Sequence, residues 1–370
     1  MHSRSLPLLL IAILVFSITT VSYAQYAGQG SPVDALFVQA DAANAEKDYA
    51  RAAQLYDAIV AQFPNDPRAP EASNKWAYAV DAQGDQDKSI AAFAQALKEY
   101  PTSTYAPGLK RSLAMAYKAK GDLDTAIKQL RELVVQYPKS PVAPEAQISI
   151  GHLYTLKVDK KNTVEVNWGF KEQAYKAWEA VFTLFPDNFE KGAEAALYCS
   201  GIAVERAHDG RQKRQDAIDQ VRALIDANKS GPKWILARCV LLVSEMALGA
   251  DDDEIALEWA QAGIKNYPDC KLEVGFAHYV AGNALESQKH YDEALQHYQI
   301  IIDGNYTKAD NFKDRDVNLY AMRRSCDCYK NLKQPDKERE AWQALVDKYP
   351  KDPIAALAKK RIAELDAAAK

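Results

Sequence analysis

Three groups of side chains in this sequence are of types that bind metals or carry redox chemistry. His290 and His297 stand seven residues apart, a spacing that can bring two imidazoles to one face of a helix. Cys326 and Cys328 are separated by a single aspartate. The run Asp251-Asp252-Asp253-Glu254 gathers carboxylates of the kind that attract calcium.

Plainer structural roles fit each group better. His290 falls at the turn before a predicted helix and no third ligand stands nearby, so we interpret both histidines as surface or partly packed residues. The Cys-Asp-Cys spacing lacks the two intervening residues of zinc and thioredoxin-type motifs, which favours packing in the core. The acidic run precedes a predicted helix, whose positive end stabilises carboxylates. We therefore expect no metal site and no cofactor.

The sequence also lacks the signatures of common catalytic sites. It contains no phosphate loop, dinucleotide fingerprint, HExxH zinc pair or nucleophile elbow. We expect no enzyme and no small-molecule substrate, and we keep an exported α/α-barrel enzyme acting on glycans as the alternative. The formal net charge of -4, with acids and bases interspersed, argues against nucleic acid as a partner.

The dominant pattern is a repeat with a period of 37 residues. Several independent columns share this period, which indicates a tandem array of small structural units. Later units keep the pattern less regularly, and the spacing widens to 48 residues between Pro138 and Pro186. The aligned columns are Phe63-Pro64, Tyr100-Pro101 and Tyr137-Pro138; Pro70, Pro107 and Pro144; and Asp48, Asp85 and Asp122.

Each unit is predicted to contain two antiparallel helices. Proline fits the first turn of a helix, so the first helix of a unit begins near Pro70 or Pro107. Gly84-Asp85 and Gly121-Asp122 end that helix, because glycine accepts the left-handed closing conformation and aspartate can cap the helix that follows.

The second helix of each unit is predicted to bury one apolar face and to stop at the Phe/Tyr-Pro pair. Repetition of this pattern predicts about eight hairpins, followed by a capping helix around Ile354 to Leu365. In the second unit the predicted buried face consists of Ile90, Phe93, Ala94 and Leu97.

At this level of detail the chain resembles the tetratricopeptide-repeat family. The segment from Ala281 to Tyr298 resembles one repeat across both helices, and so does the segment from Leu113 to Pro138. The resemblance implies an all-α fold, a right-handed superhelical solenoid of stacked antiparallel helix pairs, and protein binding rather than catalysis. In the second segment the family's key positions hold Leu113, Ala114, Tyr117, Ala126, Leu130, Leu133 and Pro138.

A finer resemblance points to the bacterial cell envelope. Phe63 to Ala72 and Tyr137 to Ala146 both run from an aromatic-Pro pair to Ala-Pro-Glu-Ala. Such units are similar to those of outer-membrane assembly lipoproteins and of the periplasmic cell-division coordinator that works with Tol-Pal, although the lipid-accepting cysteine and the coiled-coil start are missing. The resemblance implies a scaffold in envelope assembly, transport or cell division. Its partners would be other envelope proteins or peptides, with peripheral outer-membrane association through a partner.

The first 24 residues are predicted to be a secretory signal peptide, cleaved between Ala24 and Gln25. Arg4 precedes the apolar run from Leu6 to Val21, which is short for a membrane span. Retention of this run as an anchor is the alternative. We expect an exported protein, in the periplasm.

The remaining boundaries follow from breaks in the repeat. The extra residues of the fourth unit are predicted to form an enlarged turn, either a tolerated surface loop or a binding element. The five cysteines leave the disulfide pairing open, and a homo-oligomer remains a further alternative. The predicted parts are 25–32 as a short flexible start, 33–156 as a regular repeat block, 157–170 as an insertion loop, 171–353 as a divergent repeat block, and 354–370 as a capping helix and tail.

In the tetratricopeptide-repeat family the first helices line a groove that holds the partner. Arg111 and Lys118 are expected to pair with a carboxylate of the partner, and Tyr78 and Met115 to give apolar contact. The alternative is that these residues are merely solvated. Asp41 stands where chaperone-binding members have a clamp asparagine, so that clamp is not expected. By register, the resemblance assigns to the groove Asn74, Tyr78 and Asp81; Arg111, Met115 and Lys118; and Tyr279, Asn283 and Glu286.

Overall fold

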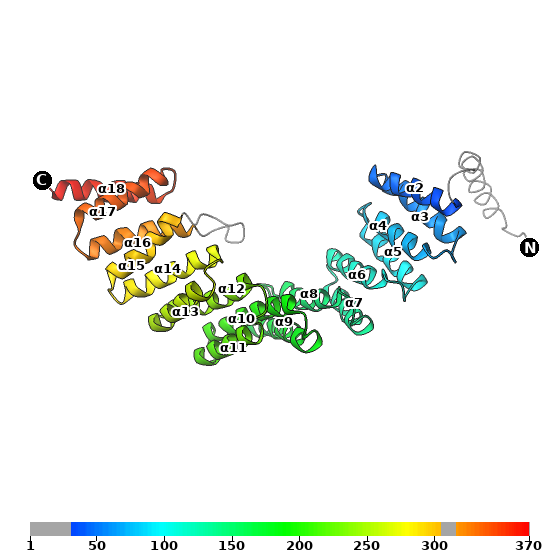
Figure 1. Cartoon of the computed structure of the whole chain (residues 1–370), viewed down its shortest axis with the longest axis horizontal. Helices are drawn as coiled ribbons and strands as arrows, with labels where there is room; N and C mark the ends of the chain where they lie inside the picture. The colour runs from blue at the N-terminus through cyan, green and yellow to red at the C-terminus, as the bar shows by residue number, and fades with distance from the viewer. Residues whose placement is uncertain (1–30, 305–315, 370) are drawn as a thin grey trace, which may run out of the picture. The chain divides into compact units, whose positions relative to one another are not determined.

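The computed structural model describes residues 31–304 and 316–369, and within these ranges it contains helices and no strand. Among the described residues, consecutive helices pair into the hairpins α2/α3, α4/α5 and α6/α7, and into α10/α11, α12/α13, α14/α15 and α16/α17, which is followed by the single helix α18 (Figure 1). The predicted signal peptide and its cleavage site at Ala24 and Gln25 lie outside the described residues. The stacked helix pairs confirm the predicted all-α repeat fold.

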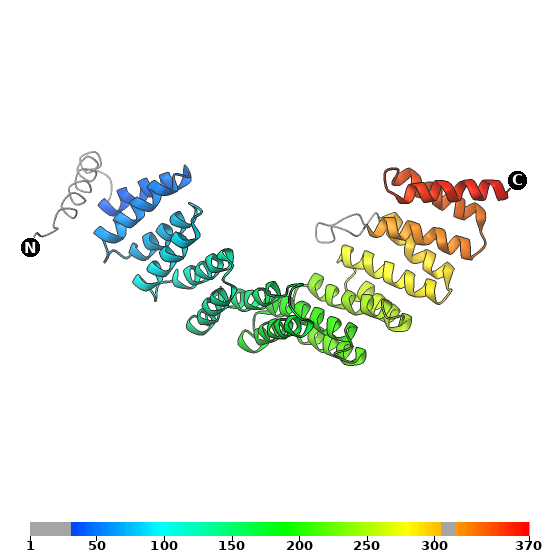
Figure 2. The same cartoon turned by 180° about the vertical axis from the view of Figure 1, so that it is seen from behind.

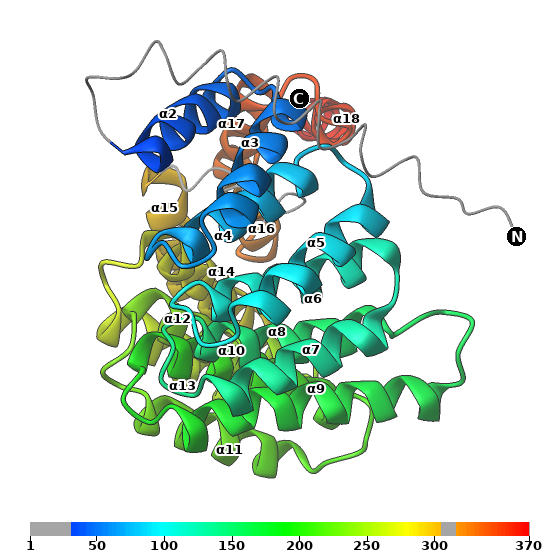
Figure 3. The same ribbon diagram turned by 90° about the vertical axis from the view of Figure 1, so that its right-hand side faces the viewer.

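The chain divides into two compact units, one ending at Phe170 and the other beginning at Lys171. In the first unit each helix from α2 to α7 packs against the next along the chain, as Figure 3 shows for α2 through α7. Its helices are α2 (Pro32–Ala45), α3 (Tyr49–Gln62), α4 (Ala69–Asp81), α5 (Gln86–Glu99), α6 (Ala106–Lys120), α7 (Leu123–Gln136), α8 (Ala143–Leu156) and the first turns of α9 (Val164–Leu184).

The second unit repeats the same arrangement with less regular sequences (Figure 2). Its closing helix, α18, includes the capping segment predicted around Ile354 to Leu365. After the remainder of α9 come α10 (Phe189–His208), α11 (Arg214–Ala227), α12 (Lys233–Leu248), α13 (Asp253–Asn266), α14 (Lys271–Ser287), α15 (Tyr291–Gly304), α16 (Val317–Asn331), α17 (Pro335–Lys348) and α18 (Ile354–Ala368).

The helix ends lie where the repeat columns place them. Gly121 closes α6 with a φ of 88°, a left-handed conformation that glycine adopts without strain. Asp122 then caps α7 by accepting a hydrogen bond from the Thr125 backbone N–H, and Asp85 caps α5 in the same way. Each hairpin therefore carries its own stop and start signals.

The buried face of the second helices differs by one position from the prediction. In α5, Phe93 is buried as expected and Ile90 and Leu97 are half-buried, but Ala94 is exposed. Small residues occupy the positions where two helices cross most closely. The buried positions are therefore those that let the helices approach each other, and they are not always the positions with the largest side chains. The fully buried positions of this helix are Ser89, Ala92, Phe93 and Ala96.

The enlarged turn predicted over 157–170 is shorter than expected, because α9 already begins at Val164. Thr163 caps the helix by accepting a hydrogen bond from the Val166 N–H, and Trp168 is buried at 4% exposure. The remaining turn is closed by the Asn162 and Asn167 side chains, which hydrogen-bond each other at 3.0 Å. Most of the extra residues therefore lengthen a helix.

None of the helices in the described ranges is both long and apolar enough to span a membrane.

Candidate protein-binding face

In the first unit, the first helices of neighbouring hairpins are joined by polar side chains along one face. Lys75 on α4 binds Asp41 on α2 at 2.9 Å, and the hydroxyl groups of Tyr78 on α4 and Ser112 on α6 hydrogen-bond at 2.7 Å. Both contacts join residues 34 positions apart. Asp41 and Tyr78 occupy equivalent positions of the 37-residue repeat, as do Lys75 and Ser112. One register of contacts therefore recurs along this face.

Asp41 is engaged within the fold on two sides. Its carboxylate accepts hydrogen bonds from the Tyr56 hydroxyl at 2.5 Å and from the Lys75 ammonium. Burial acts to raise the pKa of Asp41, but these two donors outweigh it and hold the pKa below its usual value. A residue satisfied in this way joins α2, α3 and α4 rather than receiving a partner's terminus.

The three groove residues predicted on α4 have different surroundings. Tyr78 is 41% exposed, and its ring packs edge-on against Phe93 with a centroid distance of 5.3 Å. Asn74 and Asp81 are half-buried on the same helix. Tyr78 therefore offers a ring surface whose orientation is fixed by both Phe93 and Ser112.

The three groove residues predicted on α6 form what we call the α6 stripe: Arg111, Met115 and Lys118. Their spacing of four and then three residues aligns them along one side of the helix. Arg111 and Lys118 are exposed and Met115 is half-buried. Neither cation has an acidic partner among the residues that the structure describes. The stripe thus presents two available positive charges beside an adaptable apolar side chain.

In the second unit the predicted groove residues are used by the fold itself. The Tyr298 hydroxyl donates to Asn283 at 2.7 Å and approaches Glu286 at 3.0 Å. Glu286 also faces Arg324 of α16 at 3.5 Å. The Tyr279 ring lies 6.4 Å from that of Tyr298. Asn283 and Glu286 therefore hold α15 and α16 against α14, which the sequence prediction did not include.

Sequence reasoning missed the residues that connect these faces, although the repeat contained a signal for some of them. Lys75 and Ser112 are 37 residues apart and stand three positions before Tyr78 and Met115. A search for polar pairs separated by 34 residues, three fewer than the repeat period, would have found Asp41 with Lys75 and Tyr78 with Ser112. The contact between Glu286 and Arg324 spans 38 residues, so the same search would not have found it.

The three groups first considered for chemistry take structural positions. His290 is exposed just before α15, and His297 is half-buried. Cys326 and Cys328 are fully buried, and burial raises the pKa of Cys328 to about 12, so both pack in the core as predicted. All five cysteine thiols are free.

The acidic run Asp251-Asp252-Asp253-Glu254 leads into α13, as predicted, and Asp252 faces Arg214 at 3.3 Å. In the described parts of the chain, no three histidine, cysteine or acidic side chains come together in a way that could hold a metal ion.

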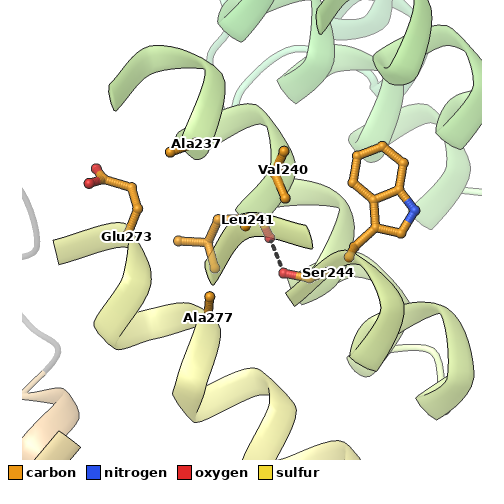
Figure 4. A pocket seen from close by; sticks show the side chains of 8 residues that line it. Ala237, Val240, Leu241, Ser244, Glu273 and Ala277 are labelled. Atoms are coloured by element: carbon orange, nitrogen blue, oxygen red, sulfur yellow. Dashed lines mark hydrogen bonds between the residues drawn. The ribbon is translucent and has the colours of Figure 1, made fainter. Parts of the chain in front are cut away.

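One small hollow lies within the second unit, between α12, α13 and α14 (Figure 4). Its volume of about 10 Å³ is close to that of a single water site. Ala237, Gly263 and Ala277 leave this gap because they are small, and Glu273 lies at its edge with a pKa raised by burial. The hollow is a packing gap, far too small for a glycan or any other substrate.

Two family profiles match the sequence. A family of outer membrane lipoproteins, YfiO, matches residues 29–177, and a tetratricopeptide-repeat profile matches residues 320–352. A comparison with curated proteins found no match.

Among solved structures, the chain is similar to a tetratricopeptide repeat protein from Parabacteroides merdae, with 13% identity over 79% of this chain and 100% of that one and a TM-score of 0.38. It is also similar to MamA, with 16% identity over 52% of this chain and 95% of that one and a TM-score of 0.34. The described residues form an all-α array of helix hairpins, in which residues 320–352 match a tetratricopeptide repeat and residues 29–177 match the YfiO family of outer membrane lipoproteins.

Proposed function

We propose that this protein is an exported, non-catalytic scaffold of the bacterial cell envelope, and that the α6 stripe binds an acidic segment of a partner protein. This proposal rests on a difference in hydrogen bonding and ion pairing between residues along one face of the first helices. Asp41, Lys75 and Tyr78 are satisfied by neighbouring helices, whereas Arg111 and Lys118 are exposed and lack an acidic partner among the described residues.

The spacing of the two cations suggests what the partner presents. Arg111 and Lys118 are seven residues apart on a helix, which separates them by roughly 10 Å along its axis. Two acids seven residues apart on a partner helix match this separation. An apolar residue between the acids would contact Met115, which adapts its shape to different surfaces.

The compartment and role are supported by the resemblance to envelope proteins. The profile of outer membrane lipoproteins covers the whole α4–α6 region, and the predicted signal peptide fits an exported chain. We propose the periplasm as the location, with contact to the outer membrane made through the partner. The same resemblance favours a role in envelope assembly, transport or cell division.

Reversal of charge on the α6 stripe is expected to abolish partner capture. The purified protein and its Arg111→Glu/Lys118→Glu variant would be immobilised and exposed to an envelope extract, and the retained proteins quantified by mass spectrometry. Two charge-assisted contacts of about 1.5–3 kcal/mol each predict at least a hundredfold weaker binding of the main partner.

The matched control is Lys98→Glu/Lys128→Glu, which reverses the same number of charges on the second helices α5 and α7, where both lysines are exposed. This control should retain the partner. Equal capture by wild-type protein and the α6 variant would overturn the proposal, and so would equal loss from both variants.

A further inference from the structure

Two histidines meet inside the hairpin formed by α14 and α15. His278 on α14 and His297 on α15 place their Nδ1 atoms 2.8 Å apart, with ring centroids separated by 5.1 Å. A hydrogen bond at this distance needs one nitrogen to carry a proton and the other to offer its lone pair. The pair therefore holds one shared Nδ1 proton, and a second proton at this contact would place two N–H groups against each other.

The surroundings of the pair favour its neutral form. His278 is only 7% exposed, and burial together with the neighbouring ring lowers its pKa to about 4. Burial also lowers the pKa of His297, against the opposing charge of Glu293 one turn earlier on α15. Glu293 itself faces the exposed His290 at 3.4 Å. Among the described residues of α12, α13 and α16, no charged side chain acts on either ring.

The next residue after each histidine belongs to the polar network of the first-helix face. Tyr279 follows His278, Tyr298 follows His297, and the two tyrosine rings pack 6.4 Å apart. Tyr298 is fully buried and holds Asn283 and Glu286 through its hydroxyl. A shift of α15 away from α14 at the histidines must therefore also move Tyr298 out of this network.

We propose that the His278–His297 pair is a pH-sensitive latch, and that uptake of a second proton releases α15 from α14 and takes apart the Tyr298–Asn283–Glu286 network. The latch itself needs no partner.

The direction of the pH effect follows from the lowered pKa values. Because the folded pair binds its second proton less readily than the unfolded chain, its stabilisation is complete above about pH 6.5 and is lost as the pH falls towards 4. Between pH 7 and 4.5, a lowering from 6.5 to about 4 corresponds to a change of roughly a hundredfold in the opening equilibrium of the hairpin.

Native-state hydrogen exchange of the full chain tests the latch. Protection factors of the α14 and α15 amides, each referenced to the unstructured rate at the same pH, should fall roughly a hundredfold between pH 7 and 4.5, and more than those of α10 and α11. In a His278→Phe/His297→Leu variant this excess should disappear. His290→Gln, which removes an exposed histidine just before α15, should keep it. An excess that persists in the double variant would overturn the proposal.

Imidazole nitrogen spectra of the wild-type protein provide a second test that does not depend on the variant folding. They should show His278 neutral down to below pH 5, with a proton shared between the two Nδ1 atoms. Titration of His278 near pH 6.5 would contradict the latch. Because neither measurement includes a partner, failure of the latch and failure of the binding proposal are distinguishable.

Discussion

Substitution of Gly282 by alanine is expected to destabilise the second unit by about 2–3 kcal/mol, the cost of overpacking a filled core. A Cβ atom at this position would lie 2.5 Å from Cε1 of the Tyr298 ring, well inside contact distance. The ring cannot yield, because Tyr298 is fully buried and its hydroxyl is held by Asn283 and Glu286. Urea unfolding followed by circular dichroism measures this loss.

The control is the same substitution at another helical glycine of the same unit. Gly201 lies in the interior of α10, and a Cβ there would meet no atom within 4 Å. Gly201→Ala should therefore stabilise the protein by up to about 1 kcal/mol, because alanine loses less backbone entropy in a helix. Equal effects of the two substitutions would show that close approach at Gly282 is not what the fold requires.

Removal of the Arg361 side chain is expected to cost about 3 kcal/mol and to loosen α18 from α17. Arg361 binds both carboxylate oxygens of Glu338, at 2.7 and 3.2 Å. Glu338 is only 3% exposed and otherwise faces the Trp342 indole N–H at 3.4 Å. Arg361→Ala would leave a buried carboxylate without its cation. Native-state hydrogen exchange in α17 and α18 reports the loss.

A double variant separates the charge from the packing. Glu338→Gln/Arg361→Met removes both charges while keeping an acceptor for Trp342 and an apolar stem of similar length. It should regain most of the stability lost in Arg361→Ala, because replacing both partners of a buried pair is far less costly than removing one. If the double variant is as unstable as the single variant, the contact acts through packing alone.

The regular half of the fold could be predicted because its signals are local. Gly121 adopts a left-handed conformation and Asp122 caps the next helix, and both properties depend on a few neighbouring residues. The start of α9 was missed because the 37-residue period fails there and the cap, Thr163, lies inside the insertion. The exposed Ala94 was missed because the 3.6-residue periodicity gives a face only to within about one position.

The helices that carry the candidate residues were predictable, but the contacts of those residues with neighbouring helices were not. The repeat register correctly placed Tyr78, Arg111 and Glu286 on the first helices, since register follows from the period. Whether such a residue is available depends on the neighbouring hairpin, which a local pattern does not describe. Glu286 is held by Tyr298 and Arg324, whereas Arg111 has no such neighbour among the described residues. The same limit concealed the contact between His278 and His297.

The most direct test of the scaffold account is lysine footprinting of the protein with its captured partner. Acetylation rates of Lys118, Lys98 and Lys128 would be compared in the free and bound protein, since all three lysines are exposed. The partner is expected to slow acetylation of Lys118 at least tenfold and to leave that of Lys98 and Lys128 unchanged. Protection of Lys98 and Lys128 with full reactivity of Lys118 would contradict this expectation, because the partner would then contact the second helices rather than the α6 stripe.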